Sequence, residues 1–535
     1  MLVKHICCLI LEKFKARGWK LVACTDLSRR TDLTAWYFSK AVHEEEGDPV
    51  RIASDRGLVC LSLSAKRKLQ LINATPELHS VLHDSVSASY EAGIDQDTQY
   101  GRDYQIKLRG SPWDTDDRDN ISAACELIAD AFDVFGKNGY HFYGSVNLKD
   151  TADSFFFEHD PSRPAGSDRY MVMALDGHHI LRLAKTDLDL VEVVKTTIDK
   201  FWPLGLDAEG QIACGRHRAK RALDRQEDDE TVFWEFVLKG SPWETAGPKI
   251  GQSRQLVTYL LDALLAHGWM ATTGLDMSRS LNKKSAILFK RCQPSESLRH
   301  ACLSPVGKQR LHLINAPISL KRLVREEFKD VLMHEKITDH QSICEMTFSG
   351  RPWWVVNPEQ ERDSYIFIRK RMGGLLQALL NAGWRLVASA DVARQTQEDK
   401  DVTGGCGIHS WFLLFSGTPT CNETEIDPIP VAPARGAILR KEKSEEDHYE
   451  RRKEFASNRV IDETSSQNGK RSSSSTPRHT AAETRSRIVS PPKTEATKET
   501  HVTHDQGGQE IQPSQRQHRP RVKLSSAMKS KSTVA

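Results

Sequence analysis

The sequence has few of the features that place a chain in a membrane or in an oxidising compartment. No apolar run among its 535 residues approaches the ~20 residues that a membrane-spanning helix needs. The 11 cysteines form no C-x-x-C pair and do not recur at matching positions, as a disulfide framework would require. We therefore expect reduced, buried thiols in an intracellular protein, located in the cytoplasm or the nucleus.

The sequence also lacks the signatures of common catalytic and cofactor sites. No G-x-x-x-x-G-K-[ST], G-x-G-x-x-G, H-E-x-x-H or G-x-S-x-G motif is present. Cys406 and His409 have a spacing that occurs in metal sites, but no second pair accompanies them, and structural zinc needs four ligands. We therefore predict no catalytic, cofactor-binding or metal-binding residue, and a protein that is not an enzyme.

Neither sign of charge is in large excess. The chain has 75 basic and 72 acidic residues, which leaves a net charge of +3. An attraction to nucleic acid or to an anionic membrane would therefore have to come from a local cluster.

The sequence does contain a repeat of roughly 120 residues, which occurs four times. One repeated phrase reads Gly-Ser-Pro-Trp or Gly-Arg-Pro-Trp and ends at Trp113, Trp243 and Trp353. The other begins with glycine and an aromatic residue, and an acid or amide follows the aromatic by seven positions: Gly18, Trp19 and Asp26; Gly139, Tyr140 and Asn147; Gly268, Trp269 and Asp276; Gly383, Trp384 and Asp391. Chance could produce one such phrase, but not both in the same order at similar spacing.

Each phrase predicts a local structure. The alternating run at 236–239 predicts a strand, which the proline of the first phrase ends. Apolar residues at helical spacing in 252–267 predict an amphipathic helix, and Gly268 follows it where a C′ glycine belongs. Apolar strands, a hairpin and a second helix complete a unit that reads β-α-β-β-β-β-α. We therefore predict an α+β fold, as a tandem array of about four such units.

The first and last copies are incomplete in this frame. The predicted repeats are 1–88, which lacks its first strand, 102–207, 231–335, which is the most complete, and 344–417, which ends early. The remainder, 418–535, is rich in polar and basic residues and predicts a disordered, modifiable tail, with a charged helix at 440–455.

The repeated acids and tryptophans each have two interpretations. Asp26, Asp276 and Asp391 could act as acids or bases, but Asn147 in the second copy favours a side chain that caps a turn. The tryptophans could stack on bases or sugars, but their apolar neighbours favour core anchors. We predict that the six tryptophans, the four glycines and the three aspartates of these phrases are structural anchors.

Basic residues at a predicted hairpin tip form the candidate anion-binding site. The tip is basic in two copies, and another arginine follows the repeated acid of the third copy. The candidate residues are Lys66, Arg67, Lys68, Arg279, Lys308 and Arg310. Such side chains could bind phosphates, although hairpin tips are often basic simply because water surrounds them.

Three classes of function remain open. The leading hypothesis is a non-enzymatic intracellular scaffold that binds protein partners through its tandem domains and its tail. The alternative is an array of anion-binding modules whose partner is an anionic lipid, such as a phosphoinositide, or nucleic acid. An enzyme with a site between domains is the least favoured, and a pocket with convergent ionisable groups would support it.

Overall fold

The computed structural model describes most of the first 417 residues. The described residues are 1–27, 34–40, 57–113, 118–147, 153–160, 166, 168–212, 232–244, 250–277, 285–338, 342–354, 361–392 and 409–417. All of them belong to one compact part of the chain, Met1–Glu454. The predicted tail and its predicted charged helix lie outside the described residues. None of the helices that are described is long and apolar enough to cross a bilayer.

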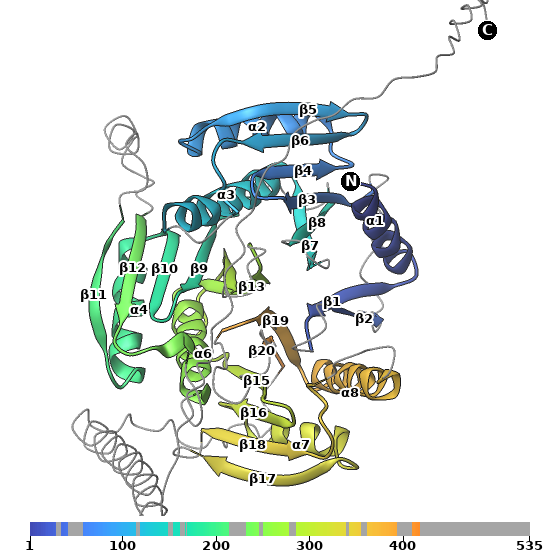
Figure 1. Ribbon diagram of the computed structural model, residues 1–535, viewed down its shortest axis with the longest axis vertical. Coiled ribbons are helices and arrows are strands. Elements are labelled where there is room, and N and C mark those ends of the chain that lie inside the picture. Colours follow the sequence, from blue (N-terminus) through green and yellow to red (C-terminus); the bar gives the residue numbers. More distant parts are fainter. Residues whose placement is uncertain are drawn as a thin grey trace, which may run out of the picture. The chain divides into compact units, whose positions relative to one another are not determined.

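Three complete units follow one another along the chain, each with the element order β-β-α-β-β-α-β-β (Figure 1). The first unit contains β3 (Val59–Ser64), β4 (Lys68–Ile72), α2 (Pro76–Ser89), β5 (Ile94–Tyr100), β6 (Asp103–Leu108), α3 (Arg118–Lys137), β7 (Tyr140–Val146) and β8 (Ser154–His159). The second contains β9 (Tyr170–Asp176), β10 (Ile180–Thr186), α4 (Leu188–Phe201), β11 (Leu206–Gln211), β12 (Val232–Leu238), the short helix η1 (Pro242–Glu244), α6 (Ile250–Ala266), β13 (Trp269–Leu275) and β14 (Ala286–Arg291). The third contains β15 (His300–Val306), β16 (Arg310–Ile314), α7 (Ile318–Glu327), β17 (Leu332–Thr338), β18 (Ile343–Phe348), α8 (Arg362–Asn381), β19 (Trp384–Ala390) and β20 (Ser410–Phe415).

Each complete unit forms one six-stranded antiparallel sheet. The strand orders are β5-β6-β4-β3-β8-β7, β11-β12-β10-β9-β14-β13 and β17-β18-β16-β15-β20-β19. In every sheet the first strand of the unit lies between the second and the last strand. The predicted α+β tandem array is therefore confirmed.

A half-unit precedes these three units. It consists of α1 (Leu2–Lys15), β1 (Trp19–Thr25) and β2 (Ala35–Lys40), which correspond to the last helix and the last two strands of a complete unit. Its strands form a two-stranded antiparallel sheet. In all four units a glycine follows the long helix with φ between +75° and +85°, the left-handed conformation that ends a helix, at Gly18, Gly139, Gly268 and Gly383.

The sheets divide the chain at different points from the predicted repeat boundaries. The predicted copy 102–207 contributes β6, β7 and β8 to one sheet and β9 and β10 to the next. The predicted copies 1–88 and 231–335 are divided in the same way, and 344–417 is the second half of the third unit. A repeated sequence reveals the period but not where a unit begins. The hairpin and the strand of the Gly-Ser-Pro-Trp phrase belong to one sheet, because β4 pairs with β6.

The predicted unit also lacked one strand that each complete unit contains. These strands are β5, β11 and β17, and each stands at the edge of its sheet. β5 and β11 are largely exposed and polar. They therefore lack the apolar alternation from which a strand is recognised in a sequence.

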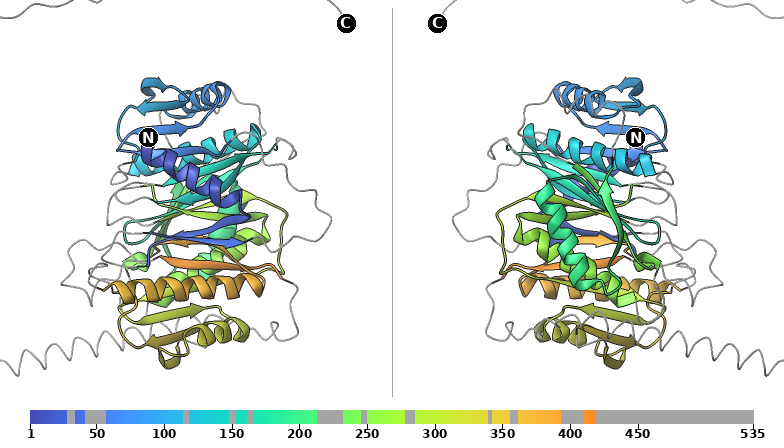
Figure 2. Two further views of the ribbon diagram at one scale, coloured as in Figure 1. Left: turned by 90° about the vertical axis from the view of Figure 1, so that its right-hand side faces the viewer. Right: turned by 90° about the vertical axis from the view of Figure 1, so that its left-hand side faces the viewer.

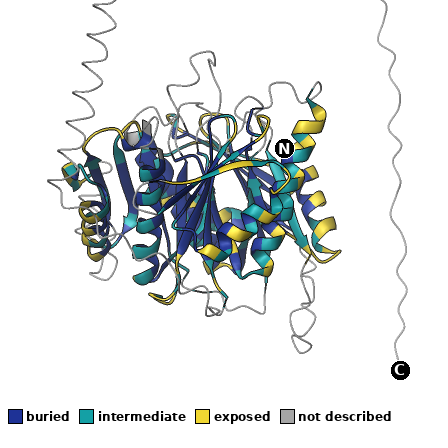
Figure 3. Cartoon of the chain, turned by 90° about the horizontal axis from the view of Figure 1, so that it is seen from below, coloured by how far each residue is buried: buried dark blue, intermediate teal, exposed yellow. Residues whose placement is uncertain are grey.

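Each long helix of a complete unit packs between two sheets. In the core around α3, Phe132 and Phe135 pack with Phe157 of their own sheet and with Val172 and Leu288 of the next sheet. The core around α6 likewise combines residues of the second and third sheets. Sheets buried on both faces explain why strands such as β8 and β15 are apolar along most of their length. The central strands are accordingly dark blue in Figure 3.

The half-unit connects the third unit back to the first. Cys8 and Leu11 of α1 are buried in one core with Cys60 and Phe156 of the first sheet. On its other side the half-unit joins the core of the third unit, where the Tyr37 hydroxyl donates to the backbone carbonyl of Arg369, 3.2 Å away. Figure 1 shows the half-unit between these two units, and in the left view of Figure 2 α1 lies at the surface. The four units thus form a closed ring of contacts.

We expect Gly274→Ala in β13 to weaken this ring. A Cβ atom there would overlap the Ser389 carbonyl group of β19, with the carbonyl carbon 2.9 Å away, so two backbones would have to separate. We expect a loss of stability of about 1–3 kcal/mol, measured as a lower melting temperature. The matched control is Gly210→Ala in β11, where no atom lies within 4 Å of the added Cβ. Equal effects of the two substitutions would contradict the close packing of β13 on β19.

Candidate functional site

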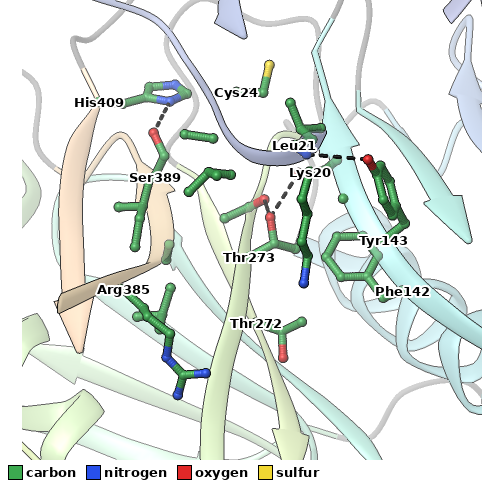
Figure 4. Close-up of a pocket in the computed structure, with 18 of the residues that line it drawn as sticks. Lys20, Leu21, Cys24, Phe142, Tyr143, Thr272, Thr273, Arg385, Ser389 and His409 are labelled. Carbon is green, nitrogen blue, oxygen red and sulfur yellow. Dashed lines mark hydrogen bonds between the residues drawn. The ribbon is translucent and has the colours of Figure 1, made fainter. Parts of the chain in front are cut away.

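Four equivalent strands surround a cavity at the centre of the ring. β1, β7, β13 and β19 each follow a long helix, and together they line a cavity of about 550 Å³ (Figures 1 and 4). Hydroxyl groups join neighbouring strands: Ser145 Oγ lies 2.9 Å from Thr273 Oγ1, and Ser389 Oγ lies 2.8 Å from Thr25 Oγ1. In each pair the two residues lie within one position of each other, counted from the aromatic residue that begins the strand, so the joined strands run in the same direction along the cavity.

One end of the cavity is closed by hydrogen bonds between units, at the repeated position Asp26, Asn147, Asp276 and Asp391. In each junction a residue just before the last strand of one unit donates to the backbone carbonyl of this position in the next unit. The bonds run from Thr34 Oγ1 to Asn147 (2.8 Å), and from the backbone N–H groups of Asp153 to Asp276 (2.9 Å), of Ser285 to Asp391 (3.0 Å) and of His409 to Asp26 (3.4 Å). The repeated acids therefore lie at equivalent junctions between units, with Asn147 at the fourth.

The junction of the first and second units contains a buried carboxyl group. Asp153 Oδ2 accepts a hydrogen bond from the backbone N–H of Asp276 at 2.7 Å, and Oδ1 accepts one from the Asn147 amide at 3.1 Å. The same amide donates to the Asp276 carboxylate at 3.3 Å. Burial raises the pKa of Asp153 to about 7, because removal from water disfavours the charged form.

Ser389 and His409 form a second polar pair in the cavity wall (Figure 4). Ser389 Oγ lies 3.1 Å from His409 Nδ1, and burial lowers the pKa of the imidazole, which keeps it neutral at pH 7. A hydroxyl beside a neutral imidazole is the pair that nucleophilic catalysis uses. Here Ser389 donates its proton to Thr25 Oγ1, so His409 Nδ1 donates to Ser389 and does not accept from it. The pair is arranged to join the third unit to the half-unit.

The opposite end of the cavity is basic. Lys20 and Arg385 follow the aromatic residue at the start of β1 and β19, and their side chains extend toward this end in Figure 4. Lys40 also belongs to the lining. Among the described lining residues the acids are Asp153 and Asp276, which lie about 20 Å away along the strands at the closed end. The cavity is therefore polarised along its length.

The predicted tryptophan anchors are buried with one exception. The buried ones are Trp113, Trp243, Trp269, Trp353 and Trp384, each at most 4% exposed. The indole N–H of Trp113 donates to the Lys68 carbonyl at 3.1 Å, and that of Trp243 to the Ile180 carbonyl at 2.8 Å, so both side chains hold the hairpin of their own unit. Trp19 is 37% exposed, because the half-unit lacks the strands that bury its counterparts.

The predicted anion-binding residues do not come together. Lys66, Arg67 and Lys68 belong to the hairpin of the first sheet, whereas Lys308 and Arg310 belong to that of the third. Arg67 lies 3.8 Å from Asp95, Arg310 lies 3.3 Å from Glu345, and Lys308 lies over the Trp354 ring. Arg279 and Cys406 lie outside the described residues. In the part of the chain that is described, no group of three or more His, Cys, Asp or Glu side chains could hold a metal ion.

A recurring acid on the long helices was not recognised in the sequence. Glu12, Asp133 and Asp262 occupy matching positions six residues before the terminal glycine. Each accepts a hydrogen bond from the backbone N–H at the start of the next sheet, and these bonds come from Leu58 (2.7 Å), Tyr170 (2.9 Å) and His300 (2.8 Å). The fourth position is Gln377, whose next sheet is the half-unit, without that strand. The fixed distance to the glycine was the signal that could have revealed them.

This architecture defines a tandem-repeat protein built from one α+β domain. A family model for a single domain matches the chain three times, over 57–160, 169–290 and 299–404, and each match falls within one of the three units, the third ending before β20. Because these matches span more than half of the chain, the chain belongs to this domain family. No curated protein and no solved structure matches the chain.

We expect the junction of the first and second units to weaken as the pH rises. A carboxyl group whose pKa is raised on folding contributes stability that is full below its unfolded pKa of about 4 and is lost through its folded pKa. For Asp153 this loss ends near pH 7. Asp153→Asn cannot titrate, so the melting temperature of the wild type should fall relative to that of this variant between pH 5 and about 8. A difference that does not vary with pH would contradict the assignment.

Proposed function

We propose that this chain is a non-enzymatic, intracellular binding protein that joins protein partners through the open face of its half-unit. The open face consists of the exposed apolar residues of α1, together with Trp19 and the outer edge of β2. The observation that supports the proposal most is that the same positions are buried in the three complete units.

The difference in exposure holds at each matching position along the long helices. On α1, Val3, Ile6, Ile10 and Phe14 are between 38% and 58% exposed. Their counterparts on α3 are at most 4% exposed and are Ala124, Leu127, Ala131 and Phe135. Matching apolar residues on α6 and α8 are buried as well, among them Leu256, Leu260, Ile368 and Leu375. In the complete units this face is covered by the first half of the same unit, and among the described residues no such half covers α1.

The outer edge of β2 is also open, whereas the matching strand edges of the complete units are paired. The matching strands β8, β14 and β20 each pair with two neighbours, whereas β2 pairs with β1 alone among the described strands. Its residues are only partly buried. An unpaired strand edge beside an exposed apolar helix face is a surface that another chain can extend.

The partner that fits best is a second copy of this chain. Two β2 edges related by a two-fold axis would pair antiparallel, as their counterparts do with first strands, and would bring two α1 faces together. A free first half of this domain fits less well. Its first strand would place a backbone N–H near Gln377. An uncharged amide there accepts a hydrogen bond less strongly than the carboxylates at the matching positions of the other long helices. Two joined rings would form a scaffold to which the predicted tail adds further partners.

The other functions have less support. An enzyme would need the Ser389–His409 pair in the opposite hydrogen-bond direction. Anion binding by the hairpin tips would need their basic side chains to converge, and these belong to different sheets.

The oligomeric state tests this proposal. We expect sedimentation velocity on the full chain over roughly 1–100 µM to show a concentration-dependent dimer. Ile6→Glu with Ile10→Glu should abolish the dimer, because the interface would bury four carboxylates without partners. The two side chains are exposed, so the variant should keep the wild-type melting temperature.

The matched control places the same charges elsewhere. Leu188 and Ile318 are 52% and 50% exposed at the starts of α4 and α7, so Leu188→Glu with Ile318→Glu should leave the dimer unchanged. A wild-type chain that stays monomeric over this range, or a dimer that survives the α1 substitutions, would refute the proposal.

A further inference from the structure

The central cavity has a feature that neither the fold nor the open face explains. Lys20 and Arg385, which are far apart in the sequence, both line its basic end; both are exposed, and neither forms an ion pair with a described residue. Other cations of the ring have a carboxylate partner, as Lys290 has in Asp168 at 2.6 Å and Lys107 has in Asp95 at 2.6 Å. Cations that line one end of a cavity without a counter-charge attract an anion.

The closed end of the cavity offers no such attraction. Its two lining acids, Asp153 and Asp276, are engaged in the junction of the first and second units, and Ser389 contacts His409. Among the described lining residues, no acid lies at the end with the two cations. The charge difference between the two ends should instead orient a ligand, with its anionic group at the mouth.

The wall between the two ends is mixed, with apolar side chains next to the cations. Leu21 and Val22 of β1, Phe142 of β7 and Leu386 and Val387 of β19 contribute to it. Thr272 of β13 adds a hydroxyl group, which Figure 4 shows below Thr273 and nearer to the end with Arg385. A volume of about 550 Å³ lies within the usual range of small-molecule sites.

We propose that the central cavity binds a small organic anion whose carboxylate, sulfonate or phosphate group contacts Lys20 and Arg385 and whose apolar body contacts β1, β7 and β19. The guanidinium of Arg385 offers two parallel N–H groups to two oxygens of such a head group, and the Lys20 ammonium offers a point charge beside it. This site is separate from the open face of the half-unit. It requires the closed ring, because β1 and β19 belong to its two ends.

The dye anilinonaphthalene sulfonate tests this site, because it combines a sulfonate with an apolar body. We would titrate it by fluorescence into the full chain carrying Ile6→Glu and Ile10→Glu, so that the open face no longer binds the dye. Lys20→Met with Arg385→Met should raise the Kd roughly ten-fold or more, since charge-assisted hydrogen bonds are lost. Added salt should weaken binding to the parent and have little effect on this variant.

Two further variants make the outcome decisive. Lys200→Met with Arg322→Met removes two exposed cations of α4 and α7, neither of which lines the cavity, and should leave the Kd unchanged. Thr272→Trp fills the cavity from β13 and should abolish binding. A Kd that changes less than two-fold in the Lys20 and Arg385 variant overturns the proposal. So does dye binding that persists in a folded Thr272→Trp variant.

Discussion

The structure depends on one packing arrangement, in which each long helix of a complete unit (α3, α6 and α8) is buried between its own sheet and the sheet of the next unit. Neither sheet alone could bury such a helix all round, and a helix that is apolar on several sides is stable only when it is enclosed. Through their carboxylates, Glu12, Asp133 and Asp262 hydrogen-bond the long helices α1, α3 and α6 to the next sheet. Folding and assembly of the ring are therefore one process. The apolar surface that each unit buries against its neighbours contributes to its free energy of unfolding.

The half-unit follows from the same constraint. Its helix supplies the second face of the first sheet, and its two strands cover α8, so it closes the ring with only three elements. The inner strand β1 occupies the fourth place around the cavity. Among the described residues no strand covers the outer face of α1, where apolar residues are exposed. Closure of the ring and an open outer surface thus have the same origin.

The sequence predicted the period, the α+β class and the helix-ending glycines, because these depend on local spacing. It could not locate the unit boundaries, since a repeated pattern has no unique starting point. β5 and β11 were missed because exposed edge strands need no apolar side chains. The cavity was missed because Lys20 and Arg385 are 365 positions apart, although both follow the aromatic residue of the second repeated phrase. Asp153 carried no signal either, since its counterparts in the other junctions are threonine, serine and histidine.

The contact between β1 and β19 is the point at which the ring closes, and a disulfide tests it directly. Thr25 Oγ1 and Ser389 Oγ lie 2.8 Å apart, although 364 positions separate them in the chain. With Cys24→Ser to prevent exchange, Thr25→Cys and Ser389→Cys should form one bond within a single chain on mild oxidation. Peptide mapping by mass spectrometry should recover the two joined peptides from monomeric protein. Two free thiols, or a bond only between chains, would contradict closure of the ring.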